Sequence, residues 1–111
     1  MNRTYQPVQS ITVKAAEDLS RCRFVDYSGN QCSANERALG VTEFNWANGD
    51  VAQVITLGVA VVETDSAVTA GQSVTASTNG KAKPVVSTEP VNGRALDTVA
   101  SAGFIRIKLV P

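Results

Sequence analysis

The chain has 111 residues, a length that fits one domain and can bury a modest hydrophobic core. Ten basic and ten acidic residues give a formal net charge of zero, so the sequence offers no electrostatic footprint for phosphate backbones or anionic membranes. No apolar run approaches the roughly 20 residues of a membrane-spanning helix, and "MNRTYQPVQS" lacks the apolar segment of a secretory signal. We therefore expect synthesis in the cytoplasm and no binding to nucleic acid or membranes.

The first ten residues are predicted to form an extended N-terminal arm ahead of a single β-rich domain that spans residues 11–111. The arm contains Pro7, and its side chains best suited to contact a partner are Arg3, Tyr5 and Gln6. Arms of this kind are often merely disordered, so docking and disorder both remain open.

In the first half of the chain, apolar residues alternate with polar ones, which is typical of β-strands. "QSITVK" places Ile11 and Val13 on one face, and "CRFVDY" predicts a second short strand before a turn at Ser28-Gly29-Asn30. "VAQVITLGVAVVET" is too long for one flat strand, so a bend or bulge is expected at Gly58.

The second half carries the clearest hairpin signal. Asn79-Gly80 lies between alternating segments, as a type I′ turn requires, and Pro84 predicts an edge or a strand end. "FIRIKLV" alternates apolar and basic residues, with Ile105, Ile107 and Leu109 expected to face inward. Helix is confined to at most one or two short turns, for which "ALDTVASA" is the first candidate and "DSAVTA" the second.

An internal repeat is suggested by the tripeptide "RAL", which occurs at residues 37–39 and again at 94–96. A strand followed by a Gly/Asn turn precedes each copy, and a strand that opens after glycine follows each copy. Two units closing around one core would make a small β-barrel or sandwich with a pseudo-repeat. The alternative is that the two halves resemble each other only because both are β-rich segments drawn mainly from Val, Thr, Ala and Gly. The flanking matches pair Leu19 with Val68 and Gly49 with Gly103.

The residues needed for common catalytic and metal sites are missing or scattered. The chain has no histidine, which removes Ser-His-Asp catalysis and histidine metal sites. Cys22 and Cys32 alone make no zinc site, and a turn that pairs Tyr27 with Cys32 would give poor disulfide geometry, so free thiols are expected.

Other candidate chemistry is equally weak. Gly80-Lys81 lacks the spacing and the hydroxyl residue of a phosphate-binding loop. Two acidic pairs are interpreted as solvated loop residues, although spacing alone does not exclude a glycosidase arrangement. We expect no enzyme activity and no cofactor. The two acidic pairs are Glu17 with Asp18 and Glu63 with Asp65.

Phe44 and Trp46 place two of the six aromatic residues in one inserted loop, "TEFNWANGD". Large aromatic side chains anchor interfaces when they are not part of a core. The loop is therefore either a lid over the chain's own barrel or a contact with a subunit or partner.

The ending "GRALDTVASAGFIRIKLV" and the middle "GVAVVETDSAVTAGQSVTASTNGKAKP" resemble the small capsid cement, or head decoration, proteins of tailed bacteriophages. The resemblance implies a compact β domain, assembled as a homotrimer, that sits on the outer surface of the phage head and clamps neighbouring major capsid protein subunits. It implies synthesis in the host cytoplasm and a place in the virion. A second hypothesis is a β-scaffold binding module that displays its loops to a host-surface sugar or protein.

Overall fold

The computed structural model describes residues 6–109 and is built almost entirely from β-strands. In this part of the chain the only helical segment is one 3-10 turn, so the predicted fold class is confirmed. The strands, in chain order, are β1 (Gln6–Lys14), β2 (Phe24–Val25), β3 (Gly40–Thr42), β4 (Val51–Thr64), β5 (Ser73–Ala76), β6 (Ala82–Pro84), β7 (Gly93–Ala95) and β8 (Gly103–Leu109). The 3-10 turn, Thr78–Gly80, lies between β5 and β6.

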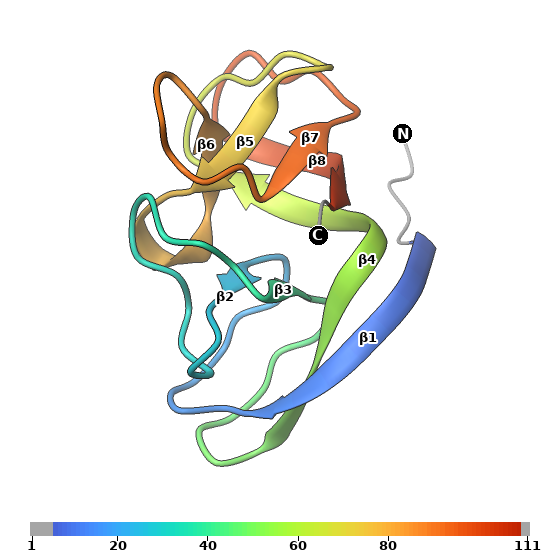
Figure 1. Cartoon of the computed structure of the whole chain (residues 1–111), viewed down its shortest axis with the longest axis vertical. Helices are drawn as coiled ribbons and strands as arrows, with labels where there is room; N and C mark the ends of the chain where they lie inside the picture. Colours follow the sequence, from blue (N-terminus) through green and yellow to red (C-terminus); the bar gives the residue numbers. More distant parts are fainter. Residues whose placement is uncertain (1–5, 110–111) are drawn as a thin grey trace.

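The strands form two lobes that share β4 (Figure 1). The second lobe contains residues 59–64 of β4 with β5 to β8, and it closes into a five-stranded barrel because β4 pairs with both β6 and β8. The first lobe contains residues 51–57 of β4 with β1, β2 and β3, and here, among residues 6–109, only β4 pairs with β1 and along one side. β1 begins at Gln6, so the last five residues assigned to the arm lie within a paired strand.

The bend predicted at Gly58 is confirmed, and it is where one lobe passes into the other. Gly58 has a φ of +108°, a conformation that side chains with a Cβ rarely adopt. The partner strand β1 is irregular at the same place, with register shifts on both sides of Gln9. β4 therefore serves as the last strand of one lobe and the first strand of the next.

The internal repeat is confirmed by the pairing of the strands. The strand pairs of the first lobe recur in the second. Equivalent residues are 49 positions apart up to Val25 and Val74, and 53 positions apart from Gly40 and Gly93 onward. Four such correspondences are Val13–Ala52 with Val62–Ile105, Leu19–Trp46 with Val68–Val99, Val25–Gly40 with Val74–Gly93, and Thr42–Val54 with Ala95–Ile107.

The two hydrophobic clusters follow the same repeat. The first-lobe cluster of Leu19, Val25 and Val54 is matched, at equivalent positions, by Val68, Val74 and Ile107 of the second-lobe cluster. The first-lobe strands also send Phe24, Val41 and Ile55 into the second cluster. The two units thus have separate centres but pack against each other, in place of the single shared core that the sequence suggested.

The "RAL" tripeptides that first suggested the repeat are not equivalent in the structure. Gly40 of β3 and Gly93 of β7 occupy equivalent positions, since Gly40 pairs with Val25 of β2 and Gly93 pairs with the equivalent Val74 of β5. The second tripeptide follows its glycine, but the first precedes its glycine and lies in the loop before β3. The shared letters are coincidental, although the order of elements inferred from them is correct.

The Asn79-Gly80 turn forms as predicted. Both residues have positive φ, 61° and 76°, and the backbone N–H of Lys81 donates to the carbonyl of Thr78 at 3.4 Å. β6 ends at Pro84, as expected. The helical turns predicted in "ALDTVASA" and "DSAVTA" are wrong, because Val68 and Val99 in these segments pair with each other through two backbone hydrogen bonds.

The final strand matches its period-two pattern. Ile105, Ile107 and Leu109 are buried, Arg106 is half-buried and Lys108 is exposed. Arg106 is held by Asp97, which accepts from its backbone N–H at 2.8 Å and from its guanidinium at 2.9 and 3.1 Å. This contact ties the loop after β7 to the outer side of β8.

The turn near Gly29 is wider than predicted. Val25 pairs with Gln31, and the Cys32 N–H donates to the Phe24 carbonyl, so the expected pairing of Tyr27 with Cys32 is wrong. The Asp26 carboxylate explains the difference, because it accepts backbone hydrogen bonds from two later residues of the turn.

Both cysteines are buried, and neither forms a disulfide, as predicted. Burial raises the pKa of the Cys32 thiol above its ordinary value of 9.0, and the nearby Glu36 and Asp26 carboxylates raise it further. In the unfolded chain the thiol would ionise near its ordinary pKa. Between that pH and the pKa of the folded state, ionisation of the thiol in the unfolded chain therefore lowers the free energy of unfolding.

We expect the free energy of unfolding to fall as the pH rises above about 9, by at most about 1.4 kcal/mol per pH unit for this thiol. Urea unfolding at a series of pH values checks this, with Cys32→Ala as the comparison. The variant should be less stable at neutral pH but should show a shallower decline in alkali. An equal slope in both proteins would contradict the assignment.

Candidate functional site

The acidic residues singled out in the sequence hold loops together. The Glu17 carboxylate accepts from the Gln31 N–H and the Asp18 carboxylate from the Asn48 N–H, each at 2.8 Å. Asp65 accepts the hydroxyl of Ser77. Within residues 6–109, no group of three or more histidine, cysteine or acidic side chains could hold a metal ion.

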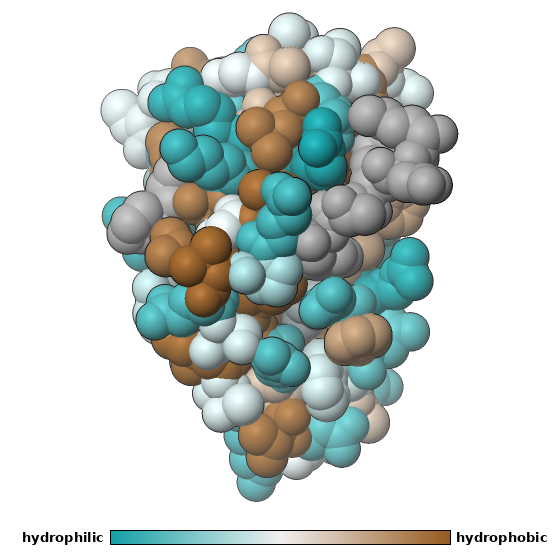
Figure 2. All heavy atoms as spheres, turned by 90° about the vertical axis from the view of Figure 1, so that its right-hand side faces the viewer, coloured by the Kyte–Doolittle hydropathy of each residue, from teal (hydrophilic) through white to brown (hydrophobic). Residues whose placement is uncertain are grey.

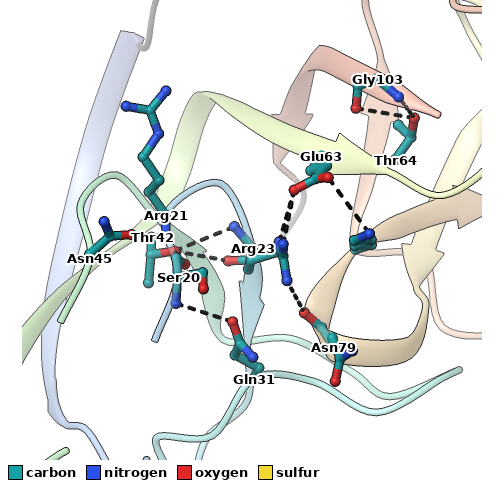
Figure 3. Close-up of polar contacts among 11 residues, drawn as sticks. Ser20, Arg21, Arg23, Gln31, Thr42, Asn45, Glu63, Thr64, Asn79 and Gly103 are labelled. Atoms are coloured by element: carbon teal, nitrogen blue, oxygen red, sulfur yellow. Dashed lines mark hydrogen bonds and ion pairs between the residues drawn. The ribbon is translucent and has the colours of Figure 1, made fainter. Parts of the chain in front are cut away.

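Glu63, the remaining acidic candidate, belongs to an ion-pair cluster between the lobes (Figure 3). Arg23 donates to one Glu63 oxygen at 2.9 and 3.2 Å and to the Asn79 carbonyl at 3.1 Å. Lys81 lies 3.6 Å from the other Glu63 oxygen. Arg23 precedes β2, whereas its partners belong to the second lobe, so the cluster joins the lobes and engages both Glu63 oxygens in ion pairs.

The two aromatic residues of the "TEFNWANGD" loop have different environments. Trp46 is half-buried, packs against the first-lobe core and exchanges two backbone hydrogen bonds with Leu19. Its indole N–H is buried and donates to no described residue. Phe44 is 57% exposed. The ring of Trp46 therefore closes the chain's own lobe, and Phe44 alone is presented to solvent.

Of the arm residues chosen from the sequence, Gln6 is exposed at the start of β1. Arg3 and Tyr5 lie outside the described residues. Gln6 pairs with Val59, on the other lobe from Phe44 and Trp46, so the structure does not bring the chosen residues into one site.

A hollow of about 260 Å³ lies between the lobes, at a place that the sequence did not indicate. Asn92 fixes its floor, since its side chain accepts from the Ala38 N–H at 3.1 Å and donates to the Glu36 carbonyl at 3.0 Å. Tyr27, 66% exposed, and Arg37 stand at its sides. The lining residues are Gln9, Ile11, Tyr27, Arg37, Ala38, Leu39, Thr56, Val91 and Asn92.

The hollow exists because β1 extends past the core of its own lobe. Val13 packs against that core, but Ile11, on the same face, is 42% exposed. Sequence alternation correctly placed both residues on one face, although it could not show where the core beneath that face ends. An exposed tyrosine and arginine around a hollow with a mixed apolar and polar lining are typical of protein-binding surfaces.

β1 is the most exposed strand of the described chain. Every residue except Val13 is exposed, including Val8 at 74%, and between residues 6 and 109 no strand pairs with its outer edge. Figure 2, viewed from the side on which β1 lies, shows hydrophobic atoms in separate areas among hydrophilic ones. Outside the atoms drawn in grey, this view shows no broad apolar patch of the kind that obligate interfaces bury.

The exposed strand β1, the hollow between the lobes and the exposed Phe44 are the candidate binding surfaces of the described chain. Residues 6–109 form a doubled β scaffold whose candidate sites are surfaces, and among these residues no helix is long and apolar enough to cross a bilayer. An exposed sheet edge and a hollow beside it are features through which proteins commonly bind other proteins.

The chain belongs to a family of phage cement proteins, whose sequence model matches residues 3–109. It is also similar to a solved structure, the N base of the head fiber protein gp8.5 of bacteriophage phi29, with a TM-score of 0.77 at 21% sequence identity. The similarity covers 92% of this chain and 93% of the phi29 chain and establishes a shared fold. No curated protein gives a significant match.

Membership of this family makes the chain a virion-associated structural protein of a bacteriophage, with a role at the capsid. The family is not an enzyme family. The resemblance inferred from the sequence is thereby confirmed.

Proposed function

We propose that the protein is a capsid decoration protein that binds the outer surface of the phage head and stabilises contacts between neighbouring major capsid protein subunits. The family match across residues 3–109 carries this proposal. The protein is made in the host cytoplasm, joins the head there, and acts by binding without catalysis or a cofactor.

The contact surface includes the N-terminal arm and the aromatic loop. Arg3 and Tyr5 ahead of β1, with Gln6 at its first position, provide a polar and aromatic anchor, and Phe44 supplies an exposed aromatic ring. Trp46 supports the loop from within the first lobe. A buried aromatic or arginine side chain typically supplies a large share of an interface's binding energy.

The protein acts as a homotrimer. Three linked copies bind a lattice by several contacts at once, so a modest affinity per copy becomes a slow overall dissociation. The small, separated apolar areas in Figure 2 fit a surface that binds through many weak contacts.

The test uses purified heads that lack the protein, to which the purified protein is added back. Decorated heads should withstand higher temperature than bare heads before releasing DNA, and electron microscopy should show density on the outer surface. Deletion of residues 1–6 and the change Phe44→Ala should each lower occupancy about tenfold, as expected for loss of an interface anchor.

The matched control is Val86→Ala, which truncates a highly exposed apolar side chain in a loop outside the proposed contact surface. This variant should bind as the wild type does. Heads that show neither added density nor added stability would refute the proposal. Binding to host cells in place of heads would support the alternative, a module that recognises a host-surface sugar or protein.

A further inference from the structure

We propose that the outer edge of β1, with the hollow beside it, is a strand-addition site that receives an extended segment of the major capsid protein. The inference rests on the proposed function and names the kind of contact by which the protein grips the lattice. In this mode an extended peptide joins a sheet edge, where backbone hydrogen bonds supply affinity and an adjacent pocket supplies specificity.

The internal repeat identifies the site, because one strand position is filled in the second lobe and empty in the first. In the second lobe, Val59 pairs with Lys108 on one side and with Gln6 on the other. Its equivalent in the first lobe is Ser10, which pairs with Ile55 on the side that corresponds to Lys108. On the other side of Ser10, no described residue forms a strand pair.

The empty position has a defined end. The Ala16 N–H donates to the Gly29 carbonyl at 3.0 Å, just as the Asp65 N–H donates to the Ala82 carbonyl at 3.1 Å in the second lobe. In the second lobe the start of β1 covers the edge beyond this point, at Val59. In the first lobe no residue between 6 and 109 pairs with the edge beyond Gly29. The open stretch is the part of β1 that contains Ser10.

The backbone along this stretch is available for pairing. In a strand bonded on one edge, alternate residues direct their N–H and C=O groups away from the partner strand, and water satisfies them in the isolated protein. The side chains on both faces of β1 from Gln6 to Thr12 are exposed, so no part of the described chain blocks an incoming strand.

The hollow would receive a side chain of that strand. Gln9 and Ile11 contribute to both the open edge and the lining of the hollow, and Tyr27 lies across it. A strand added at the edge would continue the face that carries Ile11, and its inward side chains would lie beside Tyr27. An aromatic side chain with a polar group, such as tyrosine, fits a hollow of this size, because the lining combines apolar with polar side chains.

Charge defines the occupant further. The nine residues of β1 include one charge, Lys14, and the lining of the hollow includes one charge, Arg37. Neither set contains an acidic residue. The site therefore favours a neutral or acidic segment, and a basic segment would be repelled. Pairing of β1 with β1 of a second copy would close a two-fold dimer and leave no edge for the capsid.

The experiment measures amide hydrogen exchange and binding to heads that lack the protein. On binding, the amides of residues 6–14 should become protected, whereas those of β8, already inside the barrel, should change little. The double variant Ile11→Ala with Tyr27→Ala should bind heads at least about tenfold more weakly. The matched control, Phe104→Ala, alters a 44% exposed aromatic on β8 and should bind normally.

The outcomes separate this inference from the proposed function. If the wild-type protein binds heads while β1 gains no protection and the double variant binds normally, the strand-addition site is wrong and the decoration role stands. If β1 becomes protected in the absence of heads as protein concentration rises, the edge is an interface between copies and the inference is overturned. If the wild type does not bind heads, both proposals fail. Thermal unfolding of each variant confirms that it is folded.

Discussion

Phe24→Ala is expected to lower the free energy of unfolding by about 3–5 kcal/mol, the largest loss of any single truncation in this chain. Phe24 is fully buried and is the largest side chain in the core. It belongs to β2 of the first lobe but packs in the second-lobe cluster. The change therefore leaves a cavity at the contact between lobes, where neighbouring strands are fixed by backbone pairing and cannot collapse to fill it.

This loss is large compared with the total stability of a domain of this size, typically about 5–15 kcal/mol. Urea unfolding followed by tryptophan fluorescence measures it, because Trp46 reports on the first lobe. Phe104→Ala is the control, since the same atoms are removed from a half-exposed position, and it should cost at most about 1 kcal/mol. Equal losses for the two variants would show that Phe24 does not hold the lobes together.

The same comparison of Phe24 and Phe104 shows why the strands were predictable and their assembly was not. Period-two alternation identified "FIRIKLV" as a strand and placed Ile105 and Ile107 inside, because alternation is a local property of the backbone. The burial of Phe24 in the cluster of the other lobe depends on how the two units pack, and no local pattern encodes it.

The turns, too, were predictable only where local residue requirements determine them. Asn79-Gly80 was predictable, since positive φ at two successive positions strongly limits the residues that can occupy them. "ALDTVASA" was a candidate for a short helical turn, but Val99 instead pairs with Val68 in an antiparallel bridge. Tertiary context overrode a weak local propensity.

The candidate site was only partly predictable. Phe44 was predicted to lie in a loop, where it is indeed exposed, and its role in contacting a partner stays a prediction. Trp46, two residues later, could not be distinguished from it because burial depends on the distant Leu19. Tyr27 and Ile11 belong to segments far apart in sequence, and their meeting at the hollow follows from the position of the β2 turn beside β1. The open strand position could be recognised only after the two lobes were compared pair by pair.

Gly58→Ala is expected to cost about 2–4 kcal/mol and to displace the beginning of β1 from β4. At a φ of +108°, an alanine is strained regardless of its surroundings. Here a Cβ would also lie against the Gln6 carbonyl and 2.7 Å from the Val8 N–H, so it would push directly on the paired strand. The backbone cannot yield without breaking the pairing of β1 near the bend.

The variant Gly49→Ala separates the strain of a positive φ from the clash of the added Cβ with β1. Gly49 has a similar φ of +92°, but a Cβ there would meet no atom within 4 Å, so only the conformational strain remains. The extra loss at Gly58, measured by urea unfolding, is therefore the cost of displacing β1. Amide exchange should accelerate in residues 6–10 of the Gly58 variant and remain unchanged in the Gly49 variant. If the edge of β1 binds the capsid, the Gly58 variant should also bind heads weakly at temperatures where it is fully folded. Equal stability and equal amide exchange in the two variants would mean that the position of β1 does not depend on the bend in β4.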